Sequence, residues 1–264
     1  MERDPFEGGA DIGRDITRDL GDEPPVLIRD TAPDVLAPID ESAPVSGHMP
    51  PRESTTSAAD SPEHDWSRAR DLIRPAFRPI GTQGLAMDSI DRDNLLAHAN
   101  KSHAQPLIDA VPVGLPVVYT IPAGGFDIVV NGDHLLSWGV LPSDIQDAAM
   151  GNLAAWSATA PWTDEVSGSR RLISSDTGDG LDAVRILLPD VVERLSRELG
   201  ATGRVLVGIP ERHVLAAGCL RPDDAEFASM FGDFILETSG AADEPVDRRV
   251  FEIVAGRLVE FAGV

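Results

Sequence analysis

The segment VLVGIPERHVLAA, residues 205–217, contains two apolar runs separated by the four residues 210–213. Short runs of aliphatic and β-branched residues around a polar connection are typical of a β-hairpin. We therefore expect strands at 205–209 and 214–217, joined by a turn. What precedes and follows this hairpin decides the fold class.

Helical patterns lie on both sides of the hairpin. Before it, apolar residues recur every three or four positions over 181–199, with a break expected at Pro189. After it, residues 223–239 show the same periodicity, and 249–254 with 257–261 indicate another hairpin. Hairpins separated by helices predict an α+β fold, mainly an antiparallel sheet with helices on one face.

The same signals extend towards the N-terminus. Residues 89–98 and 142–156 have the spacing of amphipathic helices, and Pro142 stands where a first-turn proline belongs. The pair Asn131-Gly132 predicts a turn. Further strands are expected at 73–80, 107–111, 115–122, 126–130 and 170–174.

The first quarter of the chain differs in composition from the rest. Residues 1–65 hold 16 acidic and five basic side chains, nine of the 21 prolines, and half of the formal net charge of −22. Such a segment buries too little apolar surface to offset chain entropy. We expect an acidic, Pro-rich, disordered tail, followed by one α+β domain at 66–264. Two apolar islands, 26–28 and 35–39, could bind a protein partner or this protein's own domain, or the tail could simply be a self-repelling, solubilising segment.

Charge and composition exclude several classes of protein. A net charge of −22 argues against nucleic-acid binding, which needs Lys and Arg surfaces. No apolar run approaches the roughly 18–20 residues of a membrane span, and the first eight residues do not have the pattern of a secretory signal. The single cysteine, Cys219, allows neither an internal disulfide nor a cysteine-based zinc cluster. We expect a cytoplasmic protein that binds neither nucleic acid nor membrane.

The most polar motif is SSDTGDGLDAVR, residues 174–185. Its aspartates, Asp176, Asp179 and Asp182, could gather a Mg²⁺ or Ca²⁺ ion. The two glycines of the motif stand where an EF-hand needs oxygen ligands, so that loop is excluded. The competing interpretation is a strand-to-helix turn in which aspartates cap the helix.

Arg185 follows Asp182 by three residues. On a helix the two could form an ion pair, or Arg185 could face a cleft and bind a carboxylate or phosphate. With Asp176 and Asp179 they are the candidate ligand-binding residues. The sequence implies no cofactor.

Other combinations of reactive residues are less promising. His213 and Cys219 would lie about 20 Å apart on an extended strand, too far for direct proton transfer. His98 and His103 have no clear third metal ligand. Residues 178–183 match a dinucleotide fingerprint only superficially, because aspartates would repel a pyrophosphate. The usual hydrolase, metalloprotease and phosphate-loop motifs are absent from the sequence.

Three short segments occur in an order that resembles the YtpQ-like family of bacterial proteins, a domain of unknown function. They are Asn152-Leu153, DGLDAVRIL at 179–187 and IPERHVL at 209–215. The resemblance covers roughly residues 72–262 and is strongest over 115–218. It implies a cytosolic α+β domain and carries no activity with it.

These observations favour a non-enzymatic module that binds a protein or a small ligand, with the tail as a further contact for a protein partner. Two alternatives belong to other classes. One is a metal-dependent enzyme built on Asp176, Asp179 and Asp182. The other is an acidic inhibitor or immunity-type protein that blocks a basic enzyme by complementary charge.

Overall fold

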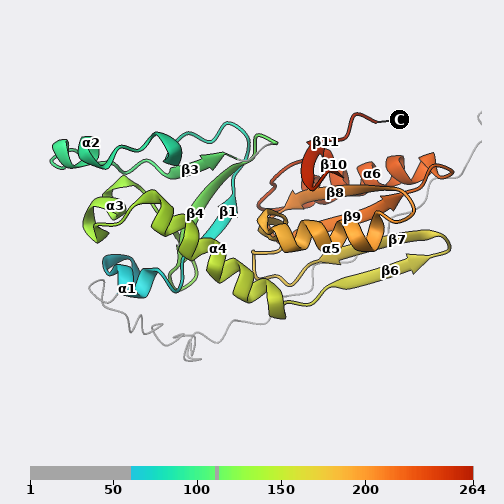
Figure 1. Ribbon diagram of the computed structural model, residues 1–264, viewed down its shortest axis with the longest axis horizontal. Coiled ribbons are helices and arrows are strands. Elements are labelled where there is room, and N and C mark those ends of the chain that lie inside the picture. Colours follow the sequence, from blue (N-terminus) through green and yellow to red (C-terminus); the bar gives the residue numbers. More distant parts are fainter. Residues whose placement is uncertain (1–60, 111–112, 264) are drawn as a thin grey trace, which may run out of the picture. The chain divides into compact units, whose positions relative to one another are not determined.

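The structure, a computed structural model, describes residues 61–110 and 113–263, all within one structural unit. The tail expected at 1–65, with its two apolar islands, lies outside the described residues apart from 61–65. Helices and mainly antiparallel strands alternate along the described part (Figure 1), which confirms the α+β class.

Residues 61–65, which composition assigns to the tail, form the first secondary structure described. Pro62–His64 is a 3₁₀ turn (η2), and the Glu63 carbonyl accepts a hydrogen bond from Trp138 Nε1 at 2.7 Å. Asp65 then caps helix α1, Trp66–Ala69, with its side chain. A long-range contact therefore holds this segment, although its composition is that of the tail.

The first sheet is built around a buried central strand, β4 (Pro116–Pro122). Strand β1 (Arg74–Phe77) pairs along one edge of β4. Strands β3 (Leu107–Ala110) and β5 (Asp127–Val129) share the opposite edge. Among the described strands, only β2 (Leu85–Ala86) and β3 pair in parallel.

Helices α2 (Arg92–Ala97), α3 (Gly132–Trp138) and α4 (Pro142–Thr159) belong to this half of the chain. Asn131 does not make the expected turn, because its side chain caps α3 by accepting from the His134 backbone N–H at 3.1 Å. Asparagine suits both roles, since its short side chain can bond to nearby backbone in either geometry. Helix α4 begins at its proline as expected and buries one apolar face.

The second sheet has six antiparallel strands in the order β11-β10-β8-β9-β7-β6. The hairpin expected at 205–217 is its centre, with Val207 opposite Ala217. Strand β6 was not expected, because its polar residues are all exposed. The strands are β6 (Thr163–Ser167), β7 (Arg170–Ser175), β8 (Arg204–Glu211), β9 (Val214–Leu220), β10 (Val250–Val254) and β11 (Arg257–Glu260).

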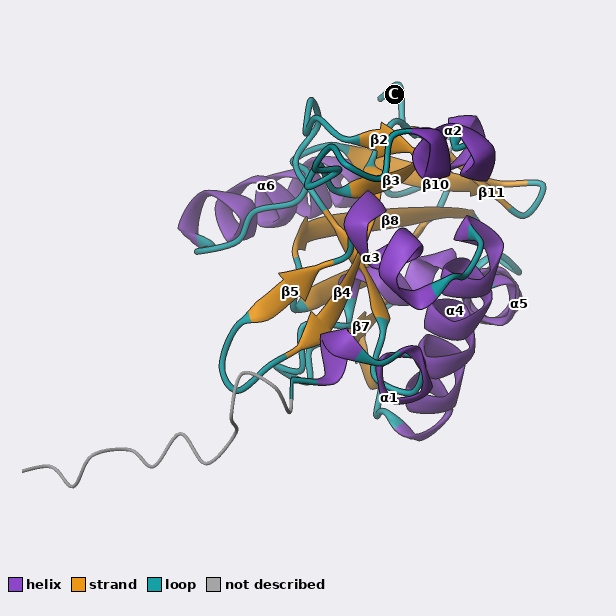
Figure 2. Ribbon diagram, turned by 90° about the vertical axis from the view of Figure 1, so that its left-hand side faces the viewer, coloured by secondary structure: helices purple, strands orange, loops and turns teal. Residues whose placement is uncertain are grey.

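Helices cover both faces of this sheet, which corrects the expectation of one sheet with helices on one face. Helix α5 (Pro189–Leu199) and the 3₁₀ helix η4 (Ala183–Leu187) pack on one face, and α6 (Ala225–Ala241) on the other (Figure 2). Alternate residues of β8 and β9 pack into the hydrophobic cores on the two faces of the sheet, because successive side chains of a strand point to opposite faces. Phe234 on α6 is 41% exposed, although the apolar periodicity of 223–239 includes it.

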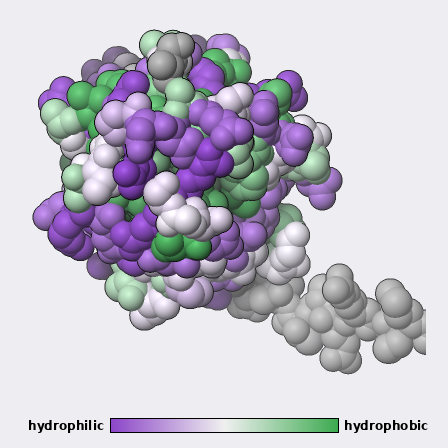
Figure 3. All heavy atoms as spheres, turned by 90° about the vertical axis from the view of Figure 1, so that its right-hand side faces the viewer, coloured by the Kyte–Doolittle hydropathy of each residue, from purple (hydrophilic) through white to green (hydrophobic). Residues whose placement is uncertain are grey.

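The surface of the described residues is predominantly polar on the face shown in Figure 3, where apolar side chains occur in small separate areas. None of the helices formed by the described residues combines the length and apolar character needed to cross a bilayer. The buried apolar side chains of the described residues form two clusters, one of them between α6 and the second sheet.

Candidate functional site

The polar motif at 174–185 runs from the end of β7 into η4. Asp182 is fully buried there, and its carboxylate accepts three hydrogen bonds. Ser175 Oγ donates at 2.5 Å, and the backbone N–H and hydroxyl of Thr177 donate at 3.1 and 2.9 Å. Asp182 therefore holds the loop onto the end of β7, and its oxygens are occupied by the protein itself.

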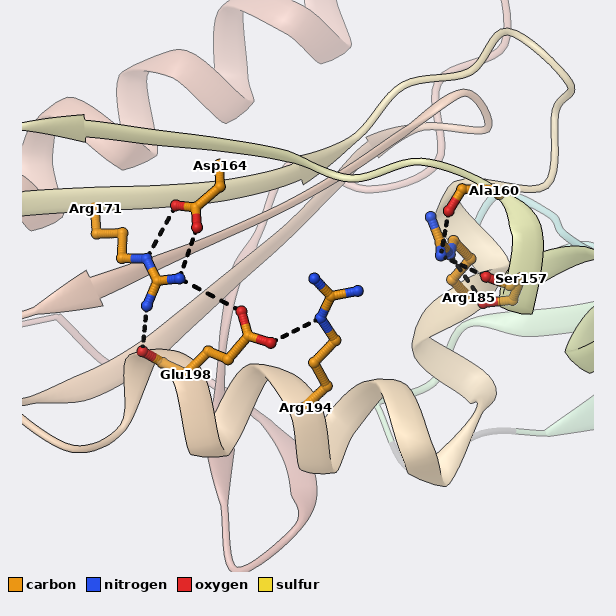
Figure 4. Close-up of polar contacts among 7 residues, drawn as sticks. All are labelled: Ser157, Ala160, Asp164, Arg171, Arg185, Arg194 and Glu198. Atoms are coloured by element: carbon orange, nitrogen blue, oxygen red, sulfur yellow. Dashed lines mark hydrogen bonds and ion pairs between the residues drawn. The ribbon is translucent and has the colours of Figure 1, made fainter.

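Arg185 is also fully buried, and its guanidinium bonds to groups around the end of α4. Nε donates to Ser157 Oγ at 3.0 Å, and Nη2 donates to the carbonyls of Ser157 and Ala160 at 2.9 and 3.3 Å (Figure 4). Nη1 donates to the Pro161 carbonyl at 3.1 Å and to Ser175 Oγ at 2.7 Å. Carbonyls near a helix C-terminus need such donors, so Arg185 completes α4.

Two indole rings enclose the same guanidinium. The central carbon of Arg185 lies 3.8 Å from the ring centroid of Trp162 and 5.4 Å from that of Trp156. Burial lowers the pKa of Arg185 to about 10, against the opposing effect of Asp182. Arg185 is thus a cation at neutral pH, stabilised inside the fold by carbonyls and aromatic faces. The expectation that it could face a cleft is wrong.

The remaining two aspartates point elsewhere. Asp176 is exposed and has no ion pair within the described part of the chain. The Asp179 carboxylate accepts a hydrogen bond from Trp156 Nε1 at 3.0 Å. Within residues 61–110 and 113–263, no group of three His, Cys, Asp or Glu side chains is placed to hold a metal. The structure therefore does not bring the three aspartates together as metal ligands.

A different place in the same unit has the geometry of a binding site. A cleft of about 1160 Å³ lies between the β4–β5 connection, the loop at 178–179, the β8–β9 turn and the end of α6. Of the sequence candidates, only Asp179 lines it. Two arginines, Arg78 and Arg212, line it together with five carboxylates: Asp127, Asp179, Glu211, Asp243 and Glu244. The excess of carboxylates favours a positively charged ligand.

Arg212 lies at the centre of this charge distribution. Its Nη2 donates to Asp127 Oδ2 at 3.0 Å, and its Nη1 donates to Glu244 Oε2 at 2.8 Å. Burial opposes the positive charge, but Glu244 and Asp127 outweigh it and raise the pKa of Arg212 above its usual value. Its Nε is buried and has no hydrogen-bond partner within the described residues.

Gly180 gives the Arg212 guanidinium its space. The backbone of Gly180 has a φ of +74°, and a Cβ there would come within 2.5 Å of Arg212 Nε. The neighbouring Gly178 has a similar φ of +78° but faces open space. The glycines expected to make a helix-capping turn therefore have distinct roles, and Gly180 lets the loop approach the cleft arginine.

Among residues 61–110 and 113–263, the histidines and the cysteine do not form a reactive pair. Cys219 is buried beside Thr202 Oγ1 at 3.4 Å, whereas His213 lines the cleft, and the imidazole Nδ1 of His213 is buried without a partner among the described residues. His103 Nε2 contacts the carbonyl oxygen of His98 at 3.2 Å, which is a backbone contact. His213 and Cys219 therefore lie in different surroundings, as expected from their separation along the strand.

A second charged cluster has a structural role. Arg171 on β7 donates to both Asp164 carboxylate oxygens, at 2.9 and 2.6 Å, and to the Glu198 carbonyl at 2.8 Å (Figure 4). Arg194 also pairs with Glu198, at 2.9 Å along α5. Hydrogen bonds from Arg171 lower the pKa of Asp164. The cluster ties the exposed β6–β7 ribbon to α5 and lies apart from the cleft.

Comparison with known proteins gives no match among family models, curated proteins or solved structures. The geometry and charge of the cleft are therefore the basis for a function. Sequence reasoning identified Arg212 only as part of a hairpin turn. No local signal distinguishes it, because its partners Asp127 and Glu244 lie 85 and 32 residues away along the chain.

Proposed function

We propose that the protein is a non-enzymatic binding module whose cleft receives a positively charged segment of a partner protein. One observation carries this proposal: five carboxylates and only two arginines line a cleft of about 1160 Å³. Three of the carboxylates, Asp179, Glu211 and Asp243, have no ion pair within the described residues, and of these only Asp179 accepts a side-chain hydrogen bond there, from Trp156. They are therefore available to a cationic ligand.

The charge of the whole chain supports the same class of ligand. A net charge of −22 attracts cations over distances set by the ionic strength, and a cleft concentrates that attraction. Phe126, which lines the cleft, is 66% exposed and offers an aromatic face to an arginine or lysine side chain. Carboxylates beside an exposed aromatic ring suit a basic peptide segment better than a bare metal ion.

Several further assignments belong to the same proposal. We assign the protein to the cytoplasm and to the YtpQ-like family, the latter on the order of its three motifs. The partner is a protein and not a nucleic acid or a membrane, because phosphate groups would be repelled by the acidic surface. An acidic inhibitor of a basic enzyme is the second candidate, and the cleft charge favours it for the same reason.

The test uses the full chain and a short fluorescent peptide of alternating arginine and glycine. Glu211→Gln combined with Asp243→Asn removes two cleft charges. The matched control, Asp147→Asn with Glu193→Gln, removes two charges from exposed positions on α4 and α5, which do not line the cleft. Fluorescence anisotropy at low and at physiological ionic strength gives the affinities.

We expect the cleft variant to lose affinity by about fivefold or more and the control by less than about twofold. Equal losses would mean that the peptide responds to net charge alone, which contradicts a specific site. An unlabelled acidic peptide should not compete, whereas the unlabelled basic peptide should.

A further inference from the structure

We propose that Arg212 is an internal placeholder, whose guanidinium occupies the Asp127–Glu244 carboxylate pair that an arginine of the partner takes on binding. This inference rests on the proposed function and names the group that the cleft recognises. It treats the contact between Arg212 and the two carboxylates as one that a ligand replaces.

The first step is the geometry of the carboxylate pair. Asp127 begins β5, Glu244 follows α6, and Arg212 reaches both from the β8–β9 turn. Each carboxylate binds a different terminal nitrogen, at 3.0 and 2.8 Å. Two acceptors spaced for two nitrogens fit a planar guanidinium fork, whereas the ammonium of lysine is a compact point charge. The pair should therefore prefer arginine.

The second step is the incomplete hydrogen bonding of Arg212 in this arrangement. Arg212 Nε is buried with no acceptor, and the neighbouring His213 Nδ1 is also buried without a partner within the described residues. Buried donors without acceptors are unfavourable. Moving Arg212 out of the pair would expose its Nε to solvent or to the backbone carbonyls of a bound peptide. The unsatisfied Nε therefore offsets part of the stabilisation that the two ion pairs give to Arg212 in this position.

The third step is access. Glu244 has half of its side chain exposed, and the side chains of Arg212 and Asp127 are 29% and 26% exposed. A ligand can therefore reach the pair from the cleft. While Arg212 occupies the pair, only the fraction of molecules in which it has moved can bind a second guanidinium, so the apparent affinity is reduced by that fraction.

The test compares Arg212→Met with Arg78→Met in the full chain. Both variants remove one positive charge from the cleft lining, but only Arg212→Met frees Asp127 and Glu244, since Arg78 has no ion pair within the described residues. The probes are the arginine–glycine peptide and a lysine–glycine peptide of equal length. Anisotropy gives the affinity of each.

We expect Arg212→Met to bind the arginine peptide about tenfold tighter than wild type, and Arg78→Met less than about threefold tighter. The lysine peptide should gain much less in Arg212→Met. Adding Asp127→Asn to Arg212→Met should abolish the gain. Equal gains in the two single variants would overturn the placeholder while leaving the proposed function intact. If neither wild type nor Arg212→Met bound the arginine peptide, both the placeholder and the proposed function would be overturned.

A second pair of variants keeps Arg212 and protects the test against misfolding. Gly180→Ala pushes a methyl group into the Arg212 guanidinium, whereas Gly178→Ala imposes the same backbone strain in open space. We expect tighter binding of the arginine peptide by Gly180→Ala alone. Identical affinities for these two folded variants would contradict the placeholder.

Discussion

Asp182 and Arg185 are joined through the hydroxyl of Ser175, which donates to Asp182 Oδ1 at 2.5 Å and accepts from Arg185 Nη1 at 2.7 Å. The hydroxyl therefore links the buried Asp182 carboxylate to the buried Arg185 guanidinium. On a regular helix, residues three apart would instead lie side by side and could pair directly. Because Arg185 also binds the end of α4, this chain of contacts connects β7, η4 and α4. It positions the loop that brings Asp179 to the cleft and Gly180 against the Arg212 guanidinium.

Replacing the bridging hydroxyl should destabilise the fold. Ser175→Ala leaves buried polar atoms of Asp182 and Arg185 with fewer partners, so the free energy of unfolding should fall by about 1–3 kcal/mol. Ser174→Ala is the matched control, because that hydroxyl has no hydrogen bond within the described residues. Urea unfolding followed by circular dichroism measures both. A loss of equal size in the control would refute a special role for Ser175.

Removing the buried cation should cost more. Arg185→Met leaves Asp182 buried without its positive neighbour and removes donors from the end of α4, so we expect a loss of about 3–5 kcal/mol. Tryptophan fluorescence reports the change directly, because Trp156 and Trp162 flank the guanidinium. Arg197→Met, at an exposed position of α5, should change stability by less than about 0.5 kcal/mol. Similar unfolding curves for the two variants would contradict this account.

The aspartates of the polar motif should differ sharply in their effect on stability. Asp182→Asn replaces a carboxylate that accepts three hydrogen bonds, and we expect a loss of about 2–3 kcal/mol. Asp176→Asn changes an exposed side chain and should alter stability by less than about 0.5 kcal/mol. Chemical denaturation of both variants provides the comparison. Equal effects would favour a joint role for the aspartates, as in a metal site.

Protonation of His134 should weaken the fold in mild acid. His134 Nδ1 lies 3.2 Å from the Asn131 backbone N and 2.7 Å from Asn131 Oδ1, and burial lowers the pKa of His134 from its ordinary 6.5, against the effects of Glu63 and Asp133. The unfolded chain therefore takes up the proton more readily than the folded one. This part of the stability is complete above about pH 6.5 and is lost as the pH falls through the lowered pKa.

The measurement is the free energy of unfolding from about pH 8 to about pH 5 for wild type and His134→Gln. Glutamine can still reach back to the Asn131 backbone, as in a capping box, but does not titrate. Wild type should lose more stability on acidification than the variant, and the difference isolates His134 from the other histidines. Parallel pH profiles would show that His134 makes no contribution.

Local sequence patterns were sufficient for much of the fold. The hairpin at 205–217, the break at Pro189 and the helix that begins at Pro142 are all present, because turns, prolines and apolar periodicity act within a few residues. Strand β6 could not be expected, since four of its five residues are polar, all five are exposed, and only pairing with β7 makes them a strand. Asn131 was misassigned because a turn and a helix cap use the same side-chain chemistry.

The sequence by itself determined the acidic charge, the α+β class and the order of most helices and strands, since each depends on composition or on neighbouring residues. Only the tertiary structure decided which charged side chains are buried and which line the cleft. It buried Asp182 and Arg185, which spacing had offered as a ligand site, and it brought Asp127 and Glu244 to Arg212 across 85 and 32 residues. Contacts over such separations leave no periodic trace in the sequence, because they arise only when two sheets and their connecting loops pack together.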